Sequence, residues 1–149
     1  MKKLGEYTCR GSIRTDNDAN RIILDDGRFD TAYRVVEFVI APHDMDNLFT
    51  YTITSKLLTD DDTSIGVNWN WDDNSEIAWA LFAFDGNAVQ TPGTFRQYDP
   101  DNLVVQDLFV RADEANGNNI KVNYFIRMEK YDISDSQGAL AMVRNRSQA

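Results

Sequence analysis

The sequence predicts an all-β protein: an antiparallel β-sandwich of about eight strands, arranged like a jelly roll. Three observations predict this fold class. Apolar residues recur with a period of two along most of the chain, as they do in half-buried strands. Clusters of turn-forming residues separate these runs at intervals of about 8–15 residues. The chain has 149 residues, which fits a single domain over 1–149 with a core of its own.

The first half of the chain supplies four predicted strands. Residues 7–14 alternate apolar and polar side chains, and residues 21–24 form a short apolar run. An Asp-Gly pair follows that run, so we expect a hairpin to the next strand. Residues 33–42 are apolar on both faces, which predicts a central strand ended by Pro42. Residues 49–58 alternate again, with threonines on the expected solvent side.

The second half supplies four more predicted strands. The stretch VNWNWDD, residues 67–73, alternates strictly and predicts a half-buried strand between two acidic turns. Residues 76–86 carry apolar side chains on both faces, which predicts a buried strand. Residues 86–102 are rich in turn-forming residues and predict a loop. Residues 103–112 and 119–133 predict the last two strands, and the second of these has the clearest alternation in the chain.

The pattern changes at the C-terminal end. Ser134 and Gln137 match the S-x-x-Q capping box that begins many helices. Apolar residues follow, and Arg144 and Arg146 fall where cations favour a helix C-terminus. We therefore expect a short helix over 134–146. Two interpretations of it stay open: it packs on its own sandwich, or it is an arm whose arginines meet acidic residues of a neighbouring copy.

Charge and composition exclude several classes of partner. The formal net charge is −9 and the pI is about 4.4, whereas nucleic-acid binding needs a basic face. The same charge argues against binding to an anionic membrane. No apolar stretch approaches the roughly 20 residues of a membrane helix. One cysteine, Cys9, allows no internal disulfide, which favours folding in the cytosol.

No motif predicts a catalytic, cofactor or metal site. His43 is the only histidine, and the chain has no Gly-x-Ser-x-Gly motif to supply a nucleophile. Residues 16–20 have the D-x-D-x-N spacing that opens a calcium loop. Arg21 then stands where that loop needs glycine, and Gly27 stands where it needs glutamate. We therefore expect no catalytic residue, no cofactor and no metal, and a protein that is not an enzyme.

Trp69 and Trp71 are the candidate contact residues. If VNWNWDD is a strand, both rings point to one face and the asparagines point to the other. Three interpretations stay open: the rings form part of the core, they anchor a subunit interface, or they form a platform on which a sugar stacks. The third interpretation would make the protein a carbohydrate-binding β-sandwich module.

Two segments resemble proteins of tailed phages. They are RIILDDGRFDTAYRVVEFVIAP, residues 21–42, and KYDISDSQGALAMVRNRSQA, residues 130–149. They are similar to short virion-associated proteins from marine phage genomes, over about a third of the chain. The resemblance implies a structural protein of the virion: a capsid decoration protein, a minor capsid subunit or a small tail component. It also implies that the protein is made in the host cytoplasm and assembles with itself or with other virion proteins.

Overall fold

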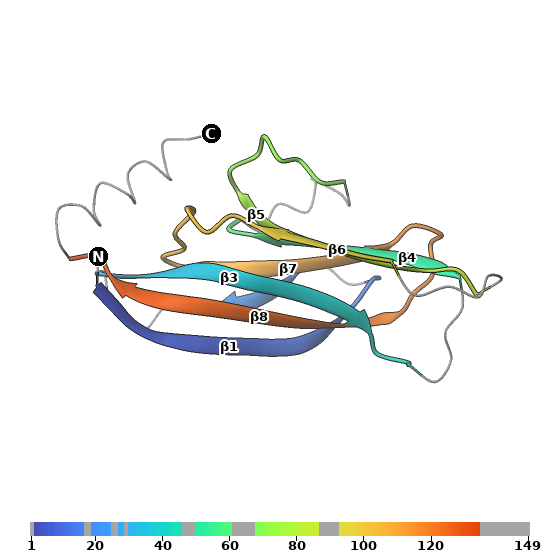
Figure 1. Cartoon of the computed structure of the whole chain (residues 1–149), viewed down its shortest axis with the longest axis horizontal. Coiled ribbons are helices and arrows are strands. Elements are labelled where there is room, and N and C mark those ends of the chain that lie inside the picture. The colour runs from blue at the N-terminus through green and yellow to red at the C-terminus, as the bar shows by residue number, and fades with distance from the viewer. Residues whose placement is uncertain are drawn as a thin grey trace.

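The computed structural model describes residues 2–16, 19–24, 27–28, 30–45, 50–60, 68–86 and 93–134. These residues form eight strands: β1 (Lys2–Arg14), β2 (Asn20–Ile23), β3 (Thr31–Pro42), β4 (Tyr51–Leu58), β5 (Glu76–Phe84), β6 (Gly93–Tyr98), β7 (Asp107–Glu114) and β8 (Lys121–Asp132). Figure 1 shows them as two layers that lie one above the other. The predicted all-β fold is confirmed, although one of the eight strands differs from the prediction.

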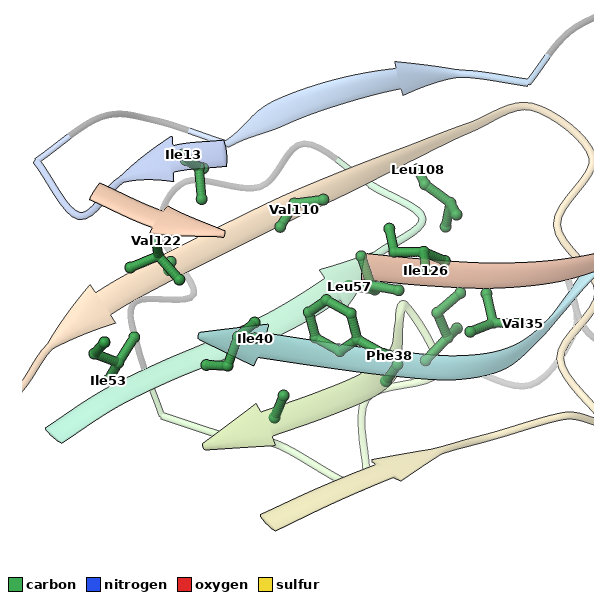
Figure 2. Close-up of a cluster of buried hydrophobic side chains, with 14 of the residues drawn as sticks. Ile13, Val35, Phe38, Ile40, Ile53, Leu57, Leu108, Val110, Val122 and Ile126 are labelled. Atoms are coloured by element: carbon green, nitrogen blue, oxygen red, sulfur yellow. The ribbon is translucent and has the colours of Figure 1, made fainter. Parts of the chain in front are cut away.

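The strands form two antiparallel sheets. One has three strands in the order β1-β8-β3, and the other has five in the order β2-β7-β4-β5-β6. The core lies between the sheets, in a sandwich-like arrangement. Figure 2 shows its centre, where Phe38 and Ile126 of the smaller sheet meet Leu57 and Val110 of the larger one. Fully burying a side chain of this size stabilises the fold by about 1.5–3 kcal/mol.

The expected hairpin around the Asp-Gly pair is wrong. Gly27 does adopt the positive φ of a turn, at 79°. The strands on its two sides, however, belong to different sheets, since β2 pairs with β7 and β3 pairs with β8. The connection therefore crosses from one layer to the other.

The prediction of 33–42 as a central strand is also wrong, because β3 lies at the edge of its sheet and β8 lies at the centre. A β-bulge between Val35 and Glu37 explains the misleading pattern. The bulge adds a residue to the strand, so Val35 and Phe38 both point into the core although they are three residues apart. Apolar residues then seem to occupy both faces when the sequence is read with a strict period of two.

Three further differences lie between the end of β4 and the start of β7. Residues 68–73, predicted as part of a strand, form turns and irregular backbone instead. Residues 93–98, predicted as a loop, form β6. All six residues of β6 are exposed, so its sequence carries no burial pattern, and pairing with β5 defines the strand. The predicted strand 103–112 begins later, at Asp107.

The predicted C-terminal helix, apart from Ser134, lies outside the described residues, and so do Arg144 and Arg146. Across the ranges that the structure describes, no helix has the length and apolar character that a membrane span requires.

Candidate functional site

The irregular segment 68–75, which we call the tryptophan loop, covers part of the outer face of the five-stranded sheet. The burial of Lys56 on β4 is the evidence for this cover. Lys56 lies opposite Trp79 on β5, on the face turned away from the core, where a lysine would ordinarily be solvated. Its side chain is nevertheless only 2% exposed. Its ammonium group donates hydrogen bonds to the carbonyl oxygen of Asn68, at 2.9 Å, and to the carboxylate of Glu76, at 3.0 Å.

The Glu76 carboxylate is the centre of this network. Its side chain is 0% exposed, and both of its oxygens accept hydrogen bonds. Oε1 accepts from the backbone N–H of Asn70 at 2.8 Å and from the indole N–H of Trp79 at 2.9 Å. Oε2 accepts from Lys56 and from the Asn70 side-chain amide, each at 3.0 Å. A buried ion pair is tolerated only when such additional bonds offset the loss of hydration.

The ionisation of Glu76 follows from these contacts. Burial alone would raise the pKa of this carboxyl group. The hydrogen bonds from Trp79, Asn70 and Lys56 together outweigh burial and lower the pKa below its ordinary value of 4.5. Glu76 is therefore ionised at neutral pH, and its charge is balanced by Lys56.

Short-range hydrogen bonds fix the rest of the tryptophan loop. The Asp73 carboxylate accepts from both the backbone N–H and the hydroxyl of Ser75, at 2.9 and 2.8 Å. Asp and Ser commonly stabilise turns in this way. The backbone N–H of Asp73 donates to Asn70, and that of Glu76 donates to Asp73. The loop is thus held both by its own turns and by the ion pair beneath it.

The two candidate tryptophans contact different aromatic rings of the larger sheet. The Trp69 ring is half-buried and lies 5.5 Å from the Phe95 ring, centroid to centroid. The Trp71 ring lies 5.6 Å from the Trp79 ring and is 62% exposed. Neither ring belongs to the core between the sheets. The strict alternation did not predict their positions because this segment is not a strand.

A second candidate surface lies on the three-stranded sheet. A hollow of about 410 Å³ is lined there by Arg10, Ser12, Val39, Ala41, Asn123 and Phe125, among others. These six residues occupy paired positions on three adjacent strands, on the face turned away from the core. The hollow combines a cation, an amide, a hydroxyl and an aromatic ring, a set that could hold a small polar or acidic group.

Other chemistry in the described part of the chain is sparse. His43 lies in an exposed segment with its Nδ1 2.8 Å from the carboxylate of Asp44. No group of three or more His, Cys, Asp or Glu side chains that could hold a metal occurs within the described ranges.

Sequence reasoning missed Lys56 and Glu76, the residues that hold the tryptophan loop. One signal could have found them. Residues 60–76 carry six acids and no Lys or Arg, so a cation that pairs with this segment must come from a neighbouring strand. Lys56 is the nearest preceding cation in the sequence. Arg144 and Arg146 are outside the described residues, so their predicted contacts stay predictions.

Comparisons of the chain with protein-family models, with curated proteins and with solved structures find no significant match. Its function is therefore inferred from its own residues and geometry.

Proposed function

We propose that this chain is a non-enzymatic structural protein of a tailed-phage virion, built as a jelly-roll-like sandwich. It would be made in the host cytoplasm and would assemble with copies of itself or with other virion proteins. Its place would be that of a capsid decoration protein, a minor capsid subunit or a small tail component. The observation that carries this proposal is the nested pairing of the eight strands.

The pairing has the pattern of one long hairpin rolled onto itself. The first strand pairs with the last, β2 pairs with β7, and β4 pairs with β5. The remaining two strands, β3 and β6, approach each other where Arg96 lies 3.7 Å from the carboxylate of Glu37. Jelly rolls, which are frequent in viral capsids and in lectins, also have eight strands in two sheets. One strand departs from this pattern. A fully nested hairpin would pair β3 with β6, whereas β6 forms its hydrogen-bond ladder with β5.

The use of polar groups is also compatible with a structural role. The buried ion pair Lys56–Glu76 is engaged with the loop that covers it, through Asn68 and Asn70. The ammonium and carboxylate groups of this pair therefore hold a surface loop in position. The resemblance of residues 21–42 and 130–149 to phage virion proteins supports the same class.

Mass spectrometry of virions purified from the phage that carries this gene tests the proposal. We expect peptides of the chain at a fixed ratio to the major capsid or tail proteins, and we expect that ratio to survive density-gradient purification and a high-salt wash. A chain that is abundant in infected cells but absent from such virions would overturn the proposal.

The predicted C-terminal arm belongs to the same proposal. We propose that residues 134–146 form a helix and that Arg144 and Arg146 contact acidic residues of a neighbouring subunit. The variant R144E/R146E should then lose incorporation into virions while its thermal unfolding stays unchanged. Normal incorporation of this variant would exclude the arm.

A second candidate function is carbohydrate binding, and the position of Trp71 favours it. The ring is 62% exposed and is carried on a loop that the Lys56–Glu76 pair holds in place. Exposed aromatic rings in fixed positions suit stacking against sugar rings. The candidate contact is therefore Trp71 first, and the half-buried Trp69 packs beside Phe95.

Tryptophan fluorescence during titration with a broad panel of glycans tests this second function. A binding glycan should change the emission of the wild type and of W69F, but not of W71A. If no glycan in the panel changes the emission of the wild type, carbohydrate binding at Trp71 is excluded, and the virion proposal stands or falls separately.

A further inference from the structure

The open edge of the three-stranded sheet is formed by β1. This strand is 13 residues long, and its described pairing partner is β8 on one side. Figure 1 shows β1 as the outermost strand of its layer, with no described element beyond it. Near one end, the Asn20 side chain donates to the carbonyl oxygen of Ser12 at 3.1 Å. The described edge before that point is open. A long unpaired edge is a ready template for another strand.

The central part of this edge, residues 5–11, is complementary to itself. Residues 5–11 read Gly-Glu-Tyr-Thr-Cys-Arg-Gly, with Thr8 at the centre. If two copies of β1 run antiparallel about a two-fold axis at Thr8, Glu6 of each copy lies opposite Arg10 of the other. Opposite charges at directly facing positions stabilise a strand pair, and the symmetry supplies this contact twice. Glycine faces glycine at both ends of the paired segment.

The inner face of the same segment fits this register. Tyr7 would lie opposite Cys9 of the second copy, on the side that faces the larger sheet. Tyr7 is 49% exposed in the single chain, although it is on the core side of β1, and Cys9 is half-buried. A second copy would cover this apolar surface. Centring the pair on Tyr7 or on Cys9 would bring no opposite charges together.

We propose that two copies of this chain join β1 to β1 over Gly5–Gly11, in antiparallel register about Thr8. The result is one continuous six-stranded sheet, β3-β8-β1-β1-β8-β3, shared by the two copies. The assembly closes as a dimer because the two-fold contact uses both open edges. At the opposite edge of the three-stranded sheet lies β3. There, within each copy, the backbones of Tyr33 and Val104 exchange two hydrogen bonds of 2.8 Å, so this position of β3 is already paired.

The edge strand β6 of the larger sheet is less suited to self-pairing. β6 has six residues, and its one charged residue is Arg96. A two-fold pair centred there would place like charges face to face, and other registers gain no ion pair. A single cation on a short edge strand discourages pairing. The proposal therefore concerns β1 alone. It does not rest on the virion role: a solution dimer would stand even if virions lacked the protein.

Charge reversal on the full chain tests the register. E6R would place two arginines opposite each other across the axis, and R10E would place two glutamates there. Each variant alone should dimerise more weakly than the wild type by about tenfold or more in analytical ultracentrifugation. Mixed in equal amounts, the two variants should form a heterodimer, because each charge then faces its opposite. K121E, an equal charge change on β8 away from the edge, should dimerise like the wild type.

A disulfide test gives a second readout that does not depend on charge. In a C9S background, T8C brings two cysteines together at the axis. Directly opposite Cα atoms in an antiparallel pair lie about 4.5–5.5 Å apart, within disulfide range. Mild oxidation should give a covalent dimer for T8C. The matched control is T94C in the same background, which places a cysteine on the exposed edge strand β6, outside the proposed contact, and should form no covalent dimer.

Three results would overturn the pairing. The wild type could remain a monomer at the highest soluble concentration. The mixture of E6R and R10E could associate no better than either variant alone. T8C could cross-link no faster than T94C. Circular dichroism of each variant confirms that it is folded before its association is compared.

Discussion

Among the described residues, lysine–glutamate contacts of similar length occur in two opposite settings. On the five-stranded sheet, Lys56 lies 3.0 Å from Glu76, and the two side chains are 2% and 0% exposed. On the three-stranded sheet, Lys3 lies 2.6 Å from Glu6 and 2.7 Å from Glu129, and its side chain is 41% exposed. Distance alone would rank the exposed contacts as stronger. Burial reverses that ranking, because water screens the exposed charges and leaves the buried ones to each other.

The two settings have different consequences for the surface around them. The buried pair holds the tryptophan loop over its sheet, so that face is covered. The exposed cluster leaves the outer face and the edge of the smaller sheet open. The hydrogen bond to Glu129, then that to Glu6, raises the pKa of Lys3, and both glutamates have a lowered pKa. These groups are solvated, so the shifts say little about stability. The tryptophan loop therefore covers part of one outer face, and the exposed cluster lies on a face that the described residues leave open.

The largest expected effect comes from breaking the buried pair. E76Q removes the counter-charge and leaves the Lys56 ammonium group buried with neutral partners. We expect a loss of about 3–5 kcal/mol in the free energy of unfolding, the usual result of leaving one buried charge unpaired. Urea denaturation measures it. The control is E129Q, the same substitution in the exposed cluster, which should unfold close to the wild type. Equal losses in the two variants would refute the role given to burial.

Acid should remove the same contribution without a mutation. The pKa of Glu76 is lowered in the folded protein, so the unfolded chain binds more protons in the range just below pH 4.5. The stabilisation is therefore complete above that range and disappears as the pH falls through the lowered pKa. The difference in unfolding free energy between the wild type and E76Q should narrow from pH 7 towards pH 3. A constant difference over this range would mean that protonation of Glu76 does not remove the contribution.

The contrast between the two faces also separates what the sequence predicted from what it did not. The strand β8 was predicted because the burial of its side chains follows the sheet period, and β5 was predicted from a short run that is apolar on both faces. The exposed strand β6 was missed because its strand conformation depends on pairing with β5 rather than on a burial pattern. The bulge in β3 hid its edge position by changing the period within the strand.

The candidate site was harder to predict for a related reason. VNWNWDD alternates as a strand would, but its conformation is set by Lys56 and Glu76, which lie outside that stretch. A local period contains no information about such anchors. The sequence therefore predicted a strand where the structure has turns and irregular backbone, and the role of Trp69 and Trp71 as contact residues stays a prediction.

The two tryptophans should respond differently to truncation. Trp69 is half-buried against Phe95, so W69A should lose about 1–2 kcal/mol, part of the value for full burial of a large side chain. Trp71 is mostly exposed, and W71A should change the free energy of unfolding by less than half of that. Thermal and urea unfolding of the two variants, compared side by side, measure the difference. A greater loss in W71A would mean that its contact with Trp79 supports the loop more than its exposure indicates.

The smallest effect should come from the exposed cluster itself. K3M removes the cation that Glu6 and Glu129 share, but the Lys3 and Glu6 side chains are exposed and Glu129 is partly exposed. At about 1 M salt the Debye length is only about 3 Å, so the urea midpoints of K3M and the wild type should coincide. At low salt a slight difference should emerge, because the two glutamates then repel each other without a cation between them. A difference that persists at high salt would mean that Lys3 stabilises the sheet by packing its aliphatic stem. In that event the open face would be more rigid than its exposed charges indicate.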